Sequence, residues 1–367
     1  MKRWGTIIAL VIALWPWQHA GAASGKTRFF IVSSYNREYL WSQDTSQGLV
    51  AAMLKFGYLD DQSQADEYTK HDYVESSKAV LKKAWMDTKR HSGEEEMKAT
   101  AAEIVQAVKE FQPNVILLGD DNAANYIGNA FLDTDTPVVF WGVNNTPIKY
   151  GLLDSAEHPG HNITGVYQLG YYVESLELLK RLAPGVKRFA TLADASETGR
   201  AFAKAIDLLA REGKLPVELA DTVSTNEFEV FQKRTLELQD KVDAFFVAPW
   251  ASMKGPQGQS MSPEDVAKWY LEHVKRPEAT GNKQYVQYGL LCTMDDSGYK
   301  QAFEAVTMAH NILANGMQPS TYHPVVPTRG NIVVNRQRAQ MLGLTPTSEM
   351  GIEEYIDNTG TLKDDAK

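Results

Sequence analysis

The sequence contains a single cysteine, Cys292, in 367 residues. An intrachain disulfide is therefore impossible, and the fold must rely on a hydrophobic core rather than on cross-links. Apolar residues make up 43% of the chain, which is enough for such a core. The run "GLLCTMDD" offers Cys292 no histidine partner, so we interpret it as a small buried residue rather than a nucleophile.

The chain also has fewer basic than acidic residues. The chain has 37 lysines and arginines against 46 aspartates and glutamates, a formal net charge of −9. Without Lys2 and Arg3 the balance is 35 against 46, or −11. An acidic surface argues against nucleic acid and against anionic membranes as partners, so we expect neither.

Long apolar runs are absent except at the start of the chain. Lys2 and Arg3 precede an apolar stretch at 4–17, and "AGAAS" follows with small residues. This layout predicts a secretory signal peptide over residues 1–23, cleaved after Ala22 or Ala23, and hence a periplasmic protein. The apolar part is short for a membrane span of roughly 20 residues, although an uncleaved anchor is the alternative.

Signatures of enzymes are missing as well. The sequence has no G-x-S-x-G, no H-E-x-x-H, no G-x-x-x-x-G-K-[ST], and no G-x-G-x-x-G after a strand. His158 and His161 in "EHPGHN" have no third ligand nearby, which is weak support for a metal. We therefore expect no catalytic residues, no metal and no cofactor.

What the chain does have is an alternation of strand-like and helix-like runs from Thr27 onward. Continuous apolar runs such as "RFFIVSS", "NVILLGD" and "TPVVFWGVNN" are each followed by a polar loop. Buried strands alternating with helices predict parallel sheets covered on both faces. Residues 59–95 interrupt this pattern, because they are polar and show only a weak strand near 65–69.

A second series begins after a crossing segment at 146–162, so the sequence predicts two α/β lobes. The last residues, 346–367, are expected to form a C-terminal tail. The elements of the second series are predicted as helices at 171–183, 199–212, 226–240 and 263–273 and as strands at 187–194, 216–222 and 243–250.

The loops that follow the strands carry the candidate chemistry, because ligands of open parallel sheets bind beyond the carboxyl ends of the strands. Hydroxyls there can hold a carboxylate, Asp120 or Asp194 can hold an ammonium, and aromatic rings can wall an apolar group. This combination favours a small amino-acid-like ligand, with a sugar as second choice. Phosphorylated ligands are less expected, because these loops lack lysine and arginine.

Simpler interpretations exist for several of these residues. Ser196 followed by Glu197 is also typical of a helix N-cap with an acidic first turn. Asp120 can likewise cap the helix that follows it. Tyr39 and Trp41 can pack against a helix face instead of facing a ligand.

The chain resembles the type I periplasmic solute-binding proteins, in the branch of ABC-transporter substrate-binding proteins that includes binders of tryptophan and other aromatic amino acids. The similarity covers essentially the whole mature chain, and the order of its motifs is more specific than any one of them. The motifs are "PVVFWGVNN", "NITGV", "LLKRLAPGVKRFATLAD", "YGLLCTMDDSGYKQAFEAVTMAHNILANGMQPSTYHPVV" and "NIVVNRQRAQMLGLTP".

The resemblance implies two doubly wound parallel-sheet lobes joined by a three-segment hinge, with ligand held between them. The crossings would lie near 146–165, 280–290 and 318–330. The first lobe would contain residues 27–145 plus 285–317, and the second 163–284 plus 328–345.

Candidate ligand contacts come from the strand-end loops and from "TMDDSGY", where the choice between Asp295 and Asp296 stays open. Tyr35 is a candidate from its position alone, and most of the others follow from the resemblance. The ligand-binding candidates are Ser33, Ser34, Tyr35, Asp120, Trp141, Asn144, Ser196, Glu197, Trp250 and Asp296.

The function that the resemblance implies is an exported, monomeric receptor that closes on a small molecule and presents it to an ABC permease. The alternative is a periplasmic sensing protein whose closed form engages a membrane sensor kinase. An α/β enzyme is the third choice.

Overall fold

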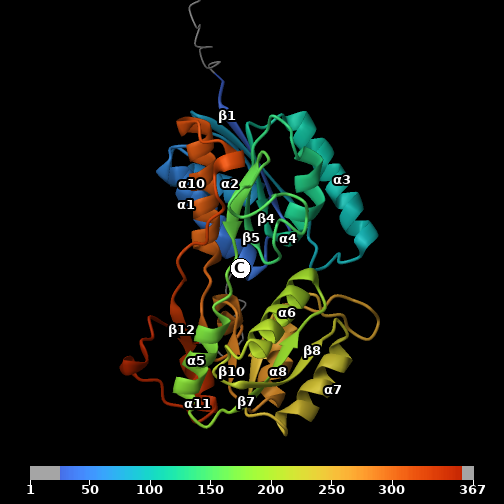
Figure 1. Cartoon of the computed structure of the whole chain (residues 1–367), viewed down its shortest axis with the longest axis vertical. Coiled ribbons are helices and arrows are strands. Elements are labelled where there is room, and N and C mark those ends of the chain that lie inside the picture. The colour runs from blue at the N-terminus through green and yellow to red at the C-terminus, as the bar shows by residue number, and fades with distance from the viewer. Residues whose placement is uncertain (1–24, 358–367) are drawn as a thin grey trace, which may run out of the picture.

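The computed structural model describes residues 25–357 and shows two lobes stacked along the long axis of the molecule (Figure 1). The predicted signal peptide, residues 1–23, lies outside the described residues, as do residues 358–367 of the predicted tail. Each lobe is built on one sheet with helices on both faces, which confirms the predicted fold class.

The first lobe contains a six-stranded sheet in which all neighbours are parallel except the edge pair β2–β3. Its central strand is the first one in the chain, so the loop that follows this strand lies in the middle of the sheet edge. In spatial order the strands are β2 (Tyr73–Glu75), β3 (Ala79–Trp85), β1 (Thr27–Ser33), β4 (Val115–Gly119), β5 (Val138–Val143) and β6 (Ile163–Tyr167).

Both faces of this sheet are covered, as the alternation along β1 shows. Phe29 and Ile31 pack toward α1 (Leu40–Lys55), α2 (Gln62–His71) and α10 (Gly298–Asn315). Phe30 and Val32 pack toward the opposite face. The elements on that face are α3 (Glu94–Phe111), α4 (Asp120–Ala123) and the short turns η1 (Ala124–Gly128) and η2 (Asn129–Phe131).

Helix α10 comes late in the chain but lies beside α1 in the first lobe (Figure 1). The two helices approach closely at Gly48, where a Cβ atom would collide with the backbone of Tyr299. Glycine at this position therefore allows α1 and α10 to approach one another this closely.

The second lobe contains a seven-stranded sheet in which β11 and β12 are the antiparallel pair. Helices α5 (Tyr172–Leu182) and α6 (Glu197–Arg211) pack on one face. Helices α7 (Phe228–Gln239) and α8 (Pro263–His273) pack on the other. The strands in spatial order are β13 (Glu354–Ile356), β12 (Ile332–Asn335), β11 (Cys292–Met294), β10 (Glu278–Thr280), β9 (Ala244–Val247), β7 (Arg188–Ala193) and β8 (Glu218–Ser224). Further helices and turns are α9 (Lys283–Gln287), α11 (Arg336–Met341), η3 (Pro319–Thr321) and η4 (Ser348–Met350).

Three short segments, 168–171, 295–297 and 326–331, connect the two sheets. The second and third are paired, because Asp295 N donates to Asn331 O at 3.0 Å and Gly330 N donates to Asp295 O at 2.8 Å. The third crossing overlaps the expected segment near 318–330, whereas the first and second lie outside the expected segments near 146–165 and 280–290.

The expected lobe boundaries shift with them. Strand β6 pairs with β5 in the first sheet, although residues 163–284 were expected in the second lobe. Strand β11 pairs with β10 in the second sheet, although 285–317 were expected in the first. Both strands are apolar runs next to a crossing, and only strand pairing decides to which sheet such a run belongs.

Three further segments differ from expectation. Residues 62–71 form helix α2 with Asp61 as its N-cap, where a weak strand was expected. Strand β3 was not expected, because two lysines interrupt its apolar pattern. The described part of the tail, 346–357, contributes η4 and β13, and β13 pairs in parallel with β12.

Cys292 is buried in β11 and is not part of a disulfide. Among residues 25–357, no helix has both the length and the apolar character needed to cross a membrane.

Candidate functional site

The carboxyl ends of the strands of one sheet face those of the other, so the strand-end loops meet between the lobes. Ser34 closes the loop after β1, because its Oγ donates to Gly119 O at 2.6 Å and accepts from Ala123 N at 2.8 Å. These bonds give Ser34 a structural role that ties β1, β4 and α4 together. Ser33 Oγ is buried and, among the described residues, has no hydrogen-bond partner.

An aromatic cluster follows in the same loop and spans the two lobes. Tyr35, Tyr39 and Trp41 are buried against Ala251, which follows β9 in the second lobe. Tyr35 OH and Thr198 Oγ1, at the start of α6, are 2.8 Å apart. The aromatic run near the N-terminus is therefore part of the interface between the lobes.

Tyr39 makes the second polar contact of this cluster. Its hydroxyl lies 3.2 Å from Tyr285 OH and accepts a hydrogen bond of 2.9 Å from Gln284 Nε2, both in α9. Burial raises the pKa of the Tyr39 hydroxyl, so it stays protonated and remains a donor. Tyr39 was not among the predicted site residues, because from the sequence it can equally pack against a helix face or face a ligand.

Asp120 is a buried carboxyl at the carboxyl end of β4. Its backbone is in the left-handed region with φ 69°, which is unusual for a residue other than glycine. Burial raises its pKa to about 8 against the hydrogen bond from Trp41 Nε1, and the neighbouring Asp121 raises it further, opposed by Lys89 and Lys83. A positive group arriving beside Asp120 would favour its ionised form.

Lys89 places a buried cation at the same interface. Its side chain is 3% exposed, its Nζ lies 3.5 Å from Ser196 Oγ across the interface, and it stands 4.7 Å from the centre of the Tyr35 ring. The strand-end loops named from the sequence contain no lysine or arginine, but Lys89 brings one to the interface. It belongs to the loop that follows β3, a strand that was not predicted.

The two adjacent carboxylates before α10, Asp295 and Asp296, have different hydrogen-bond partners. Asp295 accepts hydrogen bonds from the backbone N–H groups of Lys283 at 2.9 Å and Ser297 at 3.1 Å, which fixes it as part of the crossing. Asp296 accepts one bond, from Gln168 Nε2 in the first crossing segment, while its buried Oδ1 has no partner within residues 25–357. Burial, followed by the charge of Asp295, raises the pKa of Asp296 well above its usual range.

Ser196 and Glu197 fit their simpler interpretation. Ser196 caps α6, because its Oγ accepts from Gly199 N at 3.1 Å and donates to Asp194 Oδ1 at 2.5 Å. Glu197 Oε1 joins the lobes by contacts with Lys149 Nζ at 2.9 Å and Asn145 Nδ2 at 3.0 Å.

Asn144 packs against an aspartate of its own lobe. Both its backbone N and its side-chain Nδ2 donate to Asp121 Oδ2, at 3.1 and 3.2 Å. Asp121 also accepts from Tyr150 OH at 2.9 Å, so its carboxylate organises the loop after β5.

The two predicted tryptophans lie within the lobes. Trp141 is 1% exposed and belongs to the core between the first sheet and α10, and a Cβ at Gly119 would collide with its ring. Trp250 is fully buried between the second sheet, α7 and α8. The structure therefore places both rings in the cores of their lobes.

A small cavity of about 120 Å³ lies between the lobes beside the aromatic cluster. Asp295 and the start of α9 line it from one side, and α1 from the other. Across the described ranges, no group of three or more histidine, cysteine, aspartate or glutamate side chains is placed to hold a metal ion.

Comparison with known proteins agrees with this architecture. No curated protein matches the sequence. A solved ABC domain from Streptococcus pneumoniae in complex with L-Trp is 17% identical, with a TM-score of 0.67, covering 90% of this chain and 100% of that one. A conserved domain protein from Vibrio cholerae is 18% identical, with a TM-score of 0.69 and the same coverage.

A third solved structure is a substrate binding protein with adhesive properties from Clostridium difficile, in a ligand-free, open form. It is 19% identical, with a TM-score of 0.62, covering 90% of this chain and 99% of that one. The family model described as ABC transporter substrate binding protein matches residues 81–353. The chain therefore belongs to the ABC transporter substrate binding proteins and has the type I periplasmic binding protein fold.

Proposed function

We propose that this solute-binding protein closes its lobes on a small amino-acid-like ligand and presents it to an ABC permease. The observation that carries the proposal is that the carboxyl of Asp120 and the amine of Lys89 are both buried between the lobes. A free ammonium fits Asp120, and a free carboxylate fits the buried amine of Lys89. Asp296, whose Oδ1 has no hydrogen-bond partner in the described part of the chain, is a second acceptor for the ammonium.

The apolar part of such a ligand would meet Tyr35, Tyr39 and Trp41, because these rings pack across the interface and offer faces once the lobes separate. The L-Trp bound to the pneumococcal ABC domain is compatible with this choice, although that similarity concerns the fold alone. A sugar is the second choice, since aromatic rings also stack on sugars.

Closure of the two lobes would be the change that the permease recognises. The contacts of Tyr35 with Thr198 and of Lys149 with Glu197 join residues of different lobes, so they exist only when the lobes are together. Rotation about the three crossings would break them and open the site. A ligand that bridges the lobes favours the closed form by its differential affinity for it.

The permease that recognises the closed form would lie in the inner membrane, and the protein would act in the periplasm after loss of residues 1–23. We further propose that it is monomeric and not an enzyme. A sensing role is the second candidate, because a solved complex of TorT with the TorS sensor domain has a similar fold, with a TM-score of 0.52 and 15% identity.

Calorimetry on ligand-stripped mature protein tests the ligand class. The panel contains the amino acids, their deaminated and decarboxylated analogues, and simple sugars. We expect an amino acid to bind and both analogues to bind much more weakly. Binding of sugars alone, or equal binding of an amino acid and its deaminated analogue, would contradict the proposal.

A further inference from the structure

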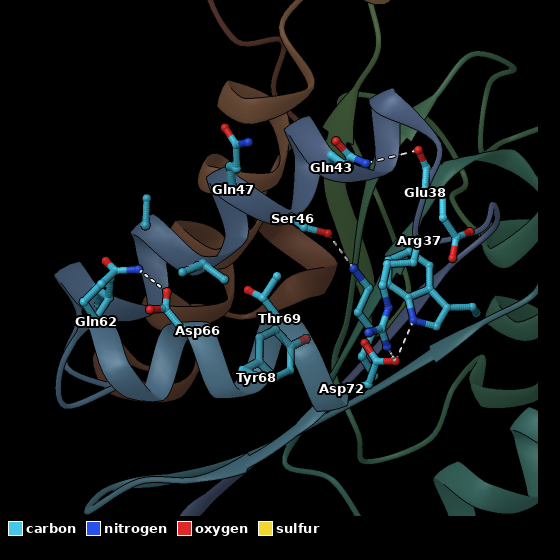
Figure 2. A pocket seen from close by; sticks show the side chains of 15 residues that line it. Arg37, Glu38, Gln43, Ser46, Gln47, Gln62, Asp66, Tyr68, Thr69 and Asp72 are labelled. Atoms are coloured by element: carbon cyan, nitrogen blue, oxygen red, sulfur yellow. Dashed lines mark hydrogen bonds and ion pairs between the residues drawn. The ribbon is translucent and has the colours of Figure 1, made fainter. Parts of the chain in front are cut away.

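A larger cavity lies inside the first lobe, away from the interface between the lobes. Its volume is about 610 Å³, within the range of about 300–1,000 Å³ found for small-molecule sites. Figure 2 shows Ser46 and Gln47 of α1 above it, and Tyr68 and Thr69 of α2 below. The residues that line it are Arg37, Glu38, Gln43, Ser46, Gln47, Val50, Ala51, Leu54, Gln62, Asp66, Tyr68, Thr69, Asp72, Lys83 and Trp85.

The charges at one end of the cavity are already balanced. Asp72 forms an ion pair with Arg37 and also accepts a hydrogen bond of 2.8 Å from Trp85 Nε1 (Figure 2). Arg37 additionally donates to Lys70 O at 2.6 Å. The carboxylate of Asp72 and the guanidinium of Arg37 therefore neutralise one another without a ligand.

Lys83 is different, because its amine is buried and, among residues 25–357, forms no ion pair. Its Nζ donates to Ser46 Oγ at 2.8 Å and lies 3.7 Å from the centre of the Trp85 ring, and within the described chain Ser46 is its only hydrogen-bond acceptor. Burial lowers the pKa of Lys83 to about 7, which Asp72 and Asp120 oppose and Arg37 reinforces. A lysine ammonium can donate three hydrogen bonds, so N–H donors of Lys83 remain for a ligand.

Tyr68 supplies a second unused donor. Its hydroxyl is buried and has no hydrogen-bond partner among residues 25–357, although the side chain lines the cavity. Burial raises its pKa well above the usual range, so the hydroxyl keeps its proton. A buried hydroxyl without a partner is unfavourable, and an acceptor group of a ligand would satisfy it.

Part of the remaining wall is apolar, because Val50, Ala51 and Leu54 of α1 line the cavity at helical spacing. We propose that this cavity is a second binding site, which takes a small monocarboxylate with an apolar body: the carboxylate meets Lys83 and Tyr68, and the body lies along α1. This proposal does not depend on the identity of the ligand between the lobes.

The test uses 4-phenylbutyrate, octanoate and indole-3-acetate as probes on the full mature protein, with 4-phenylbutanol as the uncharged counterpart. We expect at least one acid to bind, and 4-phenylbutanol to bind about tenfold or more weakly than 4-phenylbutyrate. Failure of all three acids to bind overturns the proposal.

Two lysines of β3 give a matched pair of variants. Lys83→Gln should weaken binding of the acid by about tenfold or more. Lys82→Gln should leave it unchanged, because Lys82 points to the opposite face of the sheet, near Phe30 and Phe111. Equal affinities of these two variants overturn the proposal.

Tyr68→Phe and Ala51→Leu probe the same cavity without changing charge. Tyr68→Phe should weaken binding several-fold, and Ala51→Leu should weaken it by occupying the apolar wall, which keeps the proposal testable if Lys83→Gln fails to fold. Unchanged binding in both variants contradicts the site.

Proton uptake gives a readout that a structural role of Lys83 would not produce. A carboxylate beside Lys83 favours the ammonium, so above about pH 7 binding should take up a proton, measured by calorimetry in buffers of different ionisation enthalpy. The uptake should disappear in Lys83→Gln and persist in Asp120→Asn. Uptake that disappears only in Asp120→Asn would place the probe between the lobes and overturn the second site.

Discussion

Trp41 Nε1 donates a hydrogen bond of 2.7 Å to Asp120 Oδ1 and so joins the first turn of α1 to the carboxyl end of β4. The bond holds a carboxylate in the centre of the interface between the lobes, on a backbone in the left-handed region. It satisfies one oxygen of Asp120 but supplies no positive charge to balance an ionised carboxylate. The site therefore holds a buried carboxyl that favours a cation or a proton.

Asp120→Asn should remove the partner of a ligand ammonium while nearly preserving side-chain size. We expect binding of the cognate amino acid to weaken by roughly 2–5 kcal/mol, because an ammonium is left unpaired in a closed site. Calorimetry of the variant and the parent measures the difference. The deaminated analogue is the control, and its affinity should change little; equal affinity of both proteins for the amino acid would remove Asp120 from the site.

Closure without ligand should depend on pH. The pKa of Asp120 is about 8 in the closed form, against 3.8 as its ordinary value, so closing takes up a proton between these values. As pH rises from about 5 to about 8, the closed fraction should fall, by at most about tenfold per pH unit for this group. Asp296, whose pKa is also raised, acts in the same direction.

Small-angle scattering of ligand-free protein measures this dependence as an increase in the radius of gyration with pH. Asp120→Asn should reduce the slope, and saturating ligand should suppress it, because a bound ammonium favours the ionised carboxylate. A radius that is constant over this range in the parent protein would contradict the prediction.

Glu197→Gln should have a small effect. Glu197 pairs with Lys149, whose side chain is 58% exposed, and exposed pairs contribute about 0–1 kcal/mol. We expect ligand affinity to change by no more than about fivefold, with a smaller change at high salt. A loss comparable to that of Asp120→Asn would instead identify Glu197 as a direct contact.

Trp141→Ala should mainly affect stability. The ring is packed between the first sheet and α10, and removal of a buried large aromatic side chain costs about 3–5 kcal/mol. Denaturant unfolding should show this loss, whereas ligand affinity of the folded variant should change little. Trp141→Phe is the control, with a smaller loss; a large loss of affinity at unchanged stability would restore Trp141 as a ligand contact.

The sequence by itself determined the fold class and the region of the site. Alternating buried strands and amphipathic helices leave few arrangements, and the loops after Ser33, Gly119 and Val143 had to meet at one edge of a parallel sheet. Asp120 could be identified in this way, because a carboxylate directly after a buried strand stands out. Trp141 could not be assigned correctly, since core and ligand-facing aromatics look alike in sequence.

Only the tertiary structure decided the contacts that depend on distant segments. Lys89 reaches the interface because β3, with its two lysines, pairs beside β1, and no local pattern shows this pairing. Asp295 and Asp296 are adjacent in sequence, yet backbone donors of two segments satisfy the first and leave an oxygen of the second free. Local sequence patterns follow the period of an element, whereas hydrogen-bond satisfaction and charge burial depend on which elements pack together.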